Sequence, residues 1–411
     1  MNKRILGLMS ISASLISAHS LAAGFQLNSQ SATGIGRAFS GDAVIADNAS
    51  VLSRNPASMA MFDSPALSLG LTYADIDVTI KDVNYGPINY GSERDAAEDK
   101  VIPNAYYIHP INERLAIGVA AFSNFGTGTD ISALNNSGAA VTPVDLFGKT
   151  EIVTMNFNTS LSYRVNQQLS VGAGLDLIYG EGTLNRTGEV IGGSTVQSTL
   201  VDVEADGWAI GGIVGATYEF NDKNRLGMSY RISPEFVAEG KVNYGGQSYD
   251  QIHIPLPNIL QIAGYHELNP QWAVHYTAQH TSWSDFDHIT VTGSQAEQTV
   301  KSYQWKNSWL FSLGATYQIN SKWTARAGYM YDQGVVDELS SLSIPDSDRN
   351  WYTAGATYHL SRHSSIDFGL ALVRGEDVEV KENSSIPGLG QVVGHTRSNA
   401  AYYSMQYNYS F

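Results

Sequence analysis

The chain has 411 residues, with 39 Asp and Glu against 24 Lys and Arg, a formal net charge of −15, and no cysteine. The acidic balance argues against a nucleic-acid partner, which needs a basic face, and the lack of cysteine excludes disulfides and thiolate metal sites. The 39 Gly and 23 Tyr suit a chain of strands and turns, but a soluble β-protein shares these values.

Residues 1–22 are expected to be a signal peptide. Lys3 and Arg4 precede an apolar run that begins at Ile5, and a cleavage box follows at Ser20-Leu21-Ala22, which is the pattern of an export signal. The run is too short for a transmembrane helix, and no later segment offers about 20 uninterrupted apolar residues. The sequence therefore predicts an exported chain without transmembrane helices.

Residues 23–64 show no sustained alternation of apolar and polar side chains. The stretch from Ser29 to Ala60 is rich in Ser, Ala, Gly, Asn and Asp. Ahead of the strands predicted for residues 65–411, such a segment could lie in the periplasm or fold as a plug inside a barrel. Its small polar residues suit a wet lumen, and a large barrel has room for it, so both placements stay open with the plug preferred.

Residues 65–411 are predicted to form β-strands, because apolar and polar side chains alternate with a period of two. From Val153 to Arg164 the odd positions read Val, Met, Phe, Thr, Leu, Tyr and the even ones Thr, Asn, Asn, Ser, Ser, Arg. A soluble sandwich would alternate too. Aromatic residues at the ends of the apolar faces favour an apolar face turned to lipid; these are Tyr163, Tyr179, Trp272, Trp323 and Tyr331.

Two kinds of connection alternate along this region. Short polar turns are expected around 110–113, 166–168, 221–224, 269–270, 320–322 and 361–363, and long segments around 83–100, 126–149, 187–202, 241–254, 287–300, 335–349 and 378–394. Together they join fourteen antiparallel strands, each spanning the bilayer with about 9–11 residues. The sequence thus predicts an all-β transmembrane barrel that crosses a Gram-negative outer membrane many times, and the terminal Phe411 is typical of strands recognised by barrel-assembly machinery.

Several motifs are spread over the whole region from Ala23 to Phe411. They are Ala23-Gly24-Phe25-Gln26-Leu27-Asn28, Gly36-Arg37-Ala38-Phe39-Ser40-Gly41, Ile45-Ala46-Asp47, Ser53-Arg54-Asn55-Pro56-Ala57, Asn269-Pro270-Gln271-Trp272, Thr281-Ser282-Trp283-Ser284 and Ser343-Ile344-Pro345-Asp346-Ser347-Asp348-Arg349. With these motifs the chain resembles the family of long-chain fatty-acid outer-membrane transporters.

The resemblance implies three parts: a signal peptide at 1–22, an N-terminal hatch at 23–64 inside the lumen, and a barrel of fourteen strands at 65–411. It also implies passive transport of long-chain fatty acids, with external capture, an internal pocket, and lateral exit through an inward kink in the third strand. The kink is expected at Ser123-Asn124-Phe125-Gly126, since glycine is common where a strand bends.

The resemblance further suggests roles for residues of the hatch. Phe25 matches a residue of the family's internal pocket, so substrate could displace it and shift the hatch. Asn55-Pro56-Ala57 matches a motif linked to hatch movement. Purely structural roles remain open for both, because an aromatic residue can anchor a terminus, proline fixes φ and Asn supplies local hydrogen bonds.

Arg186, Lys301 and Lys306 are the candidates for binding a fatty-acid carboxylate, which needs a cationic donor beside an apolar slot. The alternation that begins at Val171 places Leu184 and Arg186 inside the barrel, and Arg186 also matches a ligand position of the family. Pairing of Arg186 with a carboxylate of the hatch or wall is the alternative. Lys306 faces the lumen by alternation, whereas Lys301 matches the family's ligand-binding lysine but lies in an expected loop.

The expected loop 126–149 carries much apolar surface. This suggests an external capture groove, although packing against neighbouring loops would explain it equally well. The apolar residues are Ile131, Leu134, Ala139, Ala140, Val141, Val144, Leu146 and Phe147.

Other functions fit the sequence less well. An enzyme is not expected, because no histidine stands in a nucleophile-like context, and neither a metal nor a cofactor is implied. The expected partners are a long-chain fatty acid, outer-membrane lipids and the assembly machinery, and a monomer is expected. The rival function is a channel for aromatic or other hydrophobic hydrocarbons, which would share the fold and hatch without requiring a cationic site.

Overall fold

The computed structural model describes residues 24–136, 142–189, 197–294, 296–336, 340–385 and 390–411. The expected signal peptide lies outside these residues. Within them, no helix has the length and apolar character needed to cross a membrane.

Fourteen antiparallel strands form the wall of a closed barrel, as predicted. The ring closes where β1 (Ala66–Tyr85) pairs with β21 (Gln391–Ser410). From β1 round to β21 the other strands are β3 (Lys100–Pro110), β4 (Leu115–Phe122), β6 (Lys149–Arg164), β7 (Leu169–Glu189), β8 (Gln197–Asn221), β9 (Asn224–Ile232), β12 (Ile259–Asn269), β13 (Trp272–Thr281), β16 (Ser308–Gln318), β17 (Trp323–Asp332), β18 (Arg349–His359) and β19 (Ser364–Gly375).

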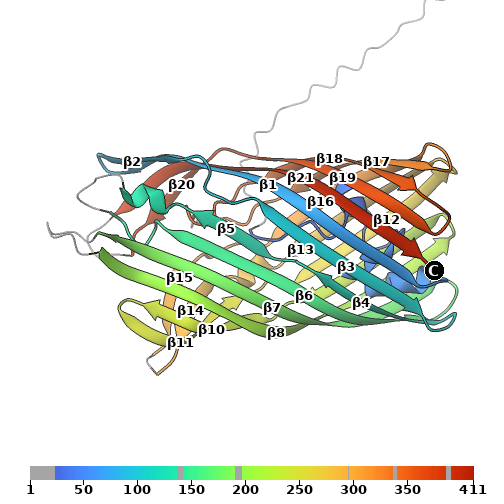
Figure 1. Ribbon diagram of the computed structural model, residues 1–411, viewed down its shortest axis with the longest axis horizontal. Coiled ribbons are helices and arrows are strands. Elements are labelled where there is room, and N and C mark those ends of the chain that lie inside the picture. Colours follow the sequence, from blue (N-terminus) through green and yellow to red (C-terminus); the bar gives the residue numbers. More distant parts are fainter. Residues whose placement is uncertain (1–23, 137–141, 190–196, 295, 337–339, 386–389) are drawn as a thin grey trace, which may run out of the picture.

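Seven shorter strands lie wholly or partly in the segments that the sequence assigned to long connections. They are β2 (Ile88–Glu93), β5 (Gly126–Asp130), β10 (Glu235–Tyr244), β11 (Gln247–Pro255), β14 (His288–Thr292), β15 (Gln298–Ser302) and β20 (Val378–Asn383). Several wall strands are also far longer than expected, and β8 has 25 residues. Extended hairpins satisfy backbone groups that irregular loops would leave unpaired. In Figure 1, β2, β11 and β20 lie at the end of the barrel opposite the C-terminus.

The two faces of the wall differ in polarity. On β6, Val153, Phe157 and Leu161 are exposed, whereas Asn158 and Ser160 are buried. Because successive side chains of a strand point to opposite faces, the apolar face is turned outward and the polar face inward, as the alternation predicted.

Residues 24–64 form short helices that the wall surrounds. The helix α1 (Ala32–Gly36) contacts β1, β17, β18, β19 and β21, and the 3-10 helix η2 (Pro56–Met61) contacts β3, β4, β6, β7 and β8. A further 3-10 helix, η1 (Ala49–Ser53), packs on η2; two others, η3 (Ser132–Asn136) and η4 (Trp283–Asp285), lie in connections of the wall. In Figure 1 the blue ribbon of this segment is seen among the strands, towards the end that holds the C-terminus.

Local side-chain bonds explain where these helices begin. The side chains of Ser31, Asn48 and Asn55 each accept a backbone N–H from the first turn that follows, which is the usual role of an N-cap. Arg37 then forms ion pairs of 2.7 Å with both Asp42 and Asp47. The segment therefore has a defined fold of its own inside the barrel.

Candidate functional site

The third strand of the wall is interrupted. It ends as β4 at Phe122 and resumes as β5 at Gly126, and both parts pair with β6. β3 pairs with β4 only from Ala105 to Pro110, so residues 100–104 have no strand partner on that side among the described residues. The interruption falls within the segment where the kink was expected.

A cavity of about 160 Å³ lies at this interruption. Its lining includes Leu27 and Phe125 from the interior, together with Val101 and Val153, which are exposed on the outer face of the wall. The cavity in the gap between β3 and β5 is therefore lined by residues of the barrel interior and by residues of its apolar outer face.

The N-terminal segment covers the inner side of this gap. Leu27 N donates to Asn124 O at 2.7 Å, and Gly126 N donates to Phe25 O at 3.0 Å. These bonds make residues 25–27 a short substitute for the missing part of the wall. The backbone of Phe25 is thus bonded directly to the edge of the gap.

Gln30 adds a side-chain contact between the same segment and the gap. Its Nε2 donates to Ser123 O at 2.8 Å and lies 3.2 Å from Asn124 Oδ1. Its Oε1 accepts from Arg54 Nη2 at 2.7 Å. Gln30 thus links the interrupted strand to Arg54, the residue that precedes Asn55.

A row of buried aromatic rings leads from the gap towards the outer end of the barrel. Phe25 lies 5.9 Å from Phe125, 4.9 Å from Trp283 and 5.1 Å from Phe286, measured between ring centroids. Phe286 in turn lies 4.8 Å from Tyr303. Offset and edge-on contacts at such distances are favourable, and together they form an apolar path between the gap and the cavity that Tyr303 lines.

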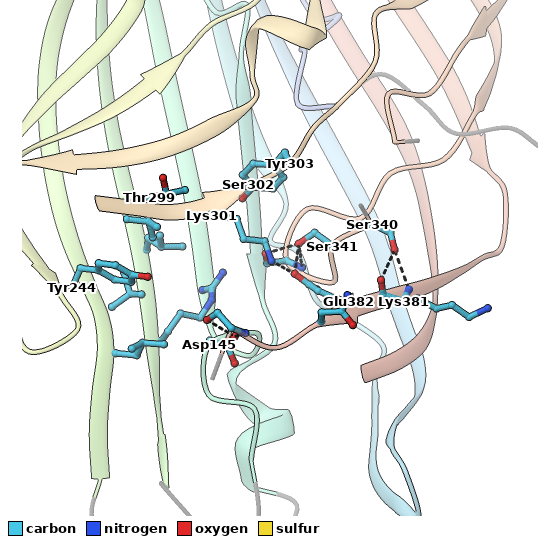
Figure 2. Close-up of a pocket in the computed structure, with 18 residues that line it drawn as sticks. Asp145, Tyr244, Thr299, Lys301, Ser302, Tyr303, Ser340, Ser341, Lys381 and Glu382 are labelled. Carbon is cyan, nitrogen blue, oxygen red and sulfur yellow. Dashed lines mark hydrogen bonds and ion pairs between the residues drawn. The ribbon is translucent and has the colours of Figure 1, made fainter. Parts of the chain in front are cut away.

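That cavity, of about 270 Å³, brings together three of the predicted ligand residues: Leu184, Arg186 and Lys301. Figure 2 shows Lys301 among the residues that line it. Arg186 is 5% exposed, and its guanidinium donates to Lys149 O, Asn185 O and Thr150 Oγ1 at 2.6–2.8 Å. No described carboxylate forms an ion pair with it. The alternative of a structural ion pair therefore finds no partner within the described residues.

Lys301 differs from Arg186, because it forms an ion pair with the buried carboxylate of Glu382 on β20. Lys306 does not line this cavity; it precedes β16, and its backbone N donates to Val335 O at 2.8 Å. The structure thus places Lys301, but not Lys306, beside Arg186. No group of three His, Asp or Glu side chains within the described ranges could hold a metal ion.

Asn55-Pro56-Ala57 sits against two glycines that are paired across β7 and β8, Gly172 and Gly215. A Cβ atom at Gly172 would lie 2.5 Å from Ala57 N, and one at Gly215 would lie 2.0 Å from Asn55 Oδ1. Asn55 also donates to Ala43 O at 2.8 Å and to Ala216 O at 3.1 Å. Only glycine allows the motif to approach the wall so closely.

Asp346 holds the start of the described chain. Its Oδ1 accepts from Gly24 N at 3.1 Å and its Oδ2 from Val335 N at 3.0 Å. Burial raises the pKa of Asp346 to about 8, against the opposing effect of Arg349. The connection between β17 and β18 therefore fixes the residue next to Phe25.

The apolar residues of the loop 126–149 do not form an open groove where they are described. Ile131, Leu134, Leu146 and Phe147 are buried in a cluster with side chains of β1, β2, β20 and β21, and Phe147 packs edge-on against Tyr90 at 5.2 Å. Packing against neighbouring hairpins accounts for them. Ala139, Ala140 and Val141 lie outside the described residues.

Sequence reasoning did not identify Gln30 or Glu382, nor the rings of Trp283, Phe286 and Tyr303 that continue the aromatic row from Phe25 and Phe125. Trp283 belongs to a motif that carried the resemblance, which was the one available signal. No sequence signal marked Gln30 or Glu382, because each acts through a partner far along the chain. Gln30 contacts Ser123, 93 positions away, and Glu382 contacts Lys301, 81 positions away.

Comparison with known proteins finds one matching family and full-length relatives. Residues 13–411 match the family described as outer membrane protein transport protein (OMPP1/FadL/TodX). The long-chain fatty acid transport protein of Escherichia coli O6:H1 is 31% identical over 98% of both chains, and outer membrane protein P1 of Haemophilus influenzae is 31% identical over 95% of both.

Solved structures share the fold. A Pseudomonas aeruginosa FadL homologue superposes with a TM-score of 0.84 at 23% identity, covering 95% of this chain and 100% of that one. The Ralstonia pickettii toluene transporter TbuX gives a TM-score of 0.66 at 18% identity, covering 93% and 98%.

Proposed function

The chain belongs to the OMPP1/FadL/TodX family of outer membrane transport proteins and is not an enzyme, and on this basis we propose that it is a passive transporter of long-chain fatty acids. The relatives named for long-chain fatty acid transport are about 30% identical over nearly the whole chain, which supports this substrate class.

The observation that carries the proposal is the environment of Arg186. Its guanidinium is buried in a cavity and has no carboxylate partner among the described residues. A buried charge without a counter-ion is costly, and the carboxylate of a bound fatty acid would remove that cost. Leu184 beside it and the ring of Tyr303 offer apolar contacts for the first part of the acyl chain.

The aromatic row supplies the route from this pocket to the membrane. An acyl chain that enters the pocket from the outside would meet Tyr303, then Phe286, and finally Phe25 at the inner side of the gap. Displacing Phe25 would break the bonds of residues 25–27 to the interrupted strand. The substrate would then leave sideways between β3 and β5, through the opening at Ser123–Gly126, into the apolar layer around the barrel.

In this proposal residues 23–64 act as a hatch within the barrel of residues 65–411. Ion pairs of Arg37 with Asp42 and Asp47 hold the middle of the hatch together. The segment near Phe25 is held by aromatic contacts and backbone hydrogen bonds, without an ion pair among the described residues. The hatch can therefore move at its N-terminal end without leaving the barrel. Asn55-Pro56-Ala57 would set how far that movement extends.

Uptake of oleate and of toluene by cells that carry the protein tests the proposal. We expect oleate to be preferred, and Arg186→Ala to lower oleate uptake by about tenfold, the effect of one lost charge-assisted contact. Arg374→Ala is the matched control, since Arg374 is exposed on the outer face of β19. Predominant toluene uptake that Arg186→Ala does not change would overturn the proposal.

The rival function, a channel for aromatic hydrocarbons, is favoured by one observation. The row from Phe25 to Tyr303 could receive a small apolar ring without any contact to Arg186. Under that function the guanidinium would have no role in uptake, so the same experiment separates the two.

A further inference from the structure

The cavity around Arg186 already contains a carboxylate of the protein. Glu382, on β20, is 4% exposed and forms an ion pair with Lys301 on β15. Figure 2 shows the Lys301 and Ser341 side chains directed towards Glu382. Three cations line the pocket: Lys301 and Lys381 are paired with Glu382 and Glu379, whereas Arg186 forms no ion pair among the described residues. The second carboxylate of the lining, Asp145, accepts hydrogen bonds from Ser384 and Ser385.

Glu382 does not depend on Lys301 alone. Its Oε2 accepts from Leu342 N at 2.7 Å and its Oε1 from Ser341 Oγ at 3.2 Å. If Lys301 turned towards a ligand, the carboxylate would keep these two donors. An exchange of partners is therefore feasible, whereas a carboxylate held by the lysine alone would be left uncompensated at high cost.

We propose that Glu382 is an internal counter-ion that competes with the substrate carboxylate for Lys301 and so limits how tightly the pocket holds a fatty acid. This inference rests on the proposed function. A transporter needs a site that binds its substrate but also releases it. With Glu382 in place, the fatty-acid carboxylate is held firmly by Arg186 and only in competition by Lys301.

Binding of oleate and of oleyl alcohol to the purified protein in detergent tests the role of Glu382. The two probes share the length of the chain and differ in the charge of the head group. We expect Glu382→Gln to tighten oleate binding by about tenfold, as one additional charge-assisted contact would, and to leave oleyl alcohol binding unchanged. Glu219→Gln is the matched control, because Glu219 also forms an ion pair, with Arg164 at 2.9 Å, but does not line the cavity.

A double-mutant cycle of Lys301 and Glu382 provides a second test if Glu382→Gln alone folds poorly. The double variant Lys301→Gln/Glu382→Gln removes both charges together, which is milder than removing one. We expect its ratio of oleate to alcohol affinity to match that of the wild type, whereas Lys301→Gln alone should lower the ratio. Heat-modifiable gel mobility shows whether each variant forms the barrel.

Two outcomes overturn the inference: Glu382→Gln leaves oleate affinity unchanged, or it changes the affinities for oleate and the alcohol equally. Either result marks Glu382 as a structural residue only. Failure of the proposed function looks different, because oleate would then bind no better than oleyl alcohol in the wild type and Arg186→Ala would have no effect on either probe.

Discussion

Gly126 N donates a hydrogen bond of 3.0 Å to Phe25 O, which joins the residue after the wall interruption to the residue at the inner end of the aromatic row. Under the proposed function, a ligand that moves the backbone of Phe25 would act directly on the edge of the gap.

Gly126→Val should lower oleate uptake while leaving oleate binding to the purified protein nearly unchanged. A Cβ atom at this position would lie 3.1 Å from Leu27 Cδ1 and 3.4 Å from Ile152 O, so a branched side chain narrows the opening. We expect about a tenfold fall in uptake, equivalent to about 1.4 kcal/mol on the barrier to exit. Gly182→Val is the control, because a Cβ atom there meets nothing closer than 3.7 Å; equal uptake in both variants would rule out this exit.

Phe25→Ala should loosen the N-terminal end of the hatch. The ring of Phe25 is 3% exposed among four aromatic side chains, and truncating a buried Phe costs about 3–5 kcal/mol. Amide hydrogen exchange at residues 24–30 and 124–126 should become faster. Phe157→Ala, on the exposed face of β6, should not have this effect, and unchanged exchange in Phe25→Ala would show that backbone bonds alone hold the segment.

Gln30→Ala should separate the interrupted strand from Arg54. The substitution removes the donor to Ser123 O and an acceptor of Arg54, at a cost of about 1–3 kcal/mol for the groups left unpaired. Gln30→Glu retains the acceptor but loses the donor, so it should keep Arg54 in place while freeing Ser123 O. Hydrogen exchange at 123–126 measures both effects; protection equal to that of the wild type in both variants would contradict the role given to Gln30.

Gly172→Ala should displace the Asn55-Pro56-Ala57 motif from the wall. The added Cβ atom would lie 2.5 Å from Ala57 N and 2.6 Å from Pro56 C, which backbone movement must relieve. We expect a loss of about 1–3 kcal/mol in the free energy of unfolding, as for overpacking in a core. Denaturant titration of refolded protein measures the loss, with Gly182→Ala as the control; equal stability of the two variants would mean that the motif does not rest on Gly172.

Asp346 should make stability depend on pH. Burial raises its pKa from 3.8 to about 8, so the folded protein retains a proton that the unfolded chain releases at lower pH. The protonated carboxyl of Asp346 therefore makes its full contribution to the free energy of unfolding below about pH 4, and this contribution is lost as the pH rises towards 8. The urea midpoint of the wild type should therefore fall over this range relative to Asp346→Asn, in which position 346 cannot ionise. A constant difference between the two would show that Asp346 does not titrate there.

The sequence by itself determined the architecture of the wall. The period of two in segments such as Val153–Arg164 placed apolar side chains outside and polar ones inside, and the alternation of short and long connections gave fourteen strands. These features are local, since strand geometry alone decides on which face each side chain lies. For the same reason, the alternation of inward and outward side chains that begins at Val171 placed Leu184 and Arg186 in the interior. Both line the cavity in the structure.

Only the tertiary structure decided which side chains meet inside that wall. The alternation of inward and outward side chains is lost in irregular segments, so the sequence could not choose between Lys301 and Lys306. Nothing in the sequence indicated that Glu382 pairs with Lys301. The apolar residues of the loop 126–149 could equally form a groove or a packed core until the neighbouring hairpins were placed. Such contacts join segments far apart in the chain, and they depend on how a closed barrel brings its loops and its N-terminal segment together.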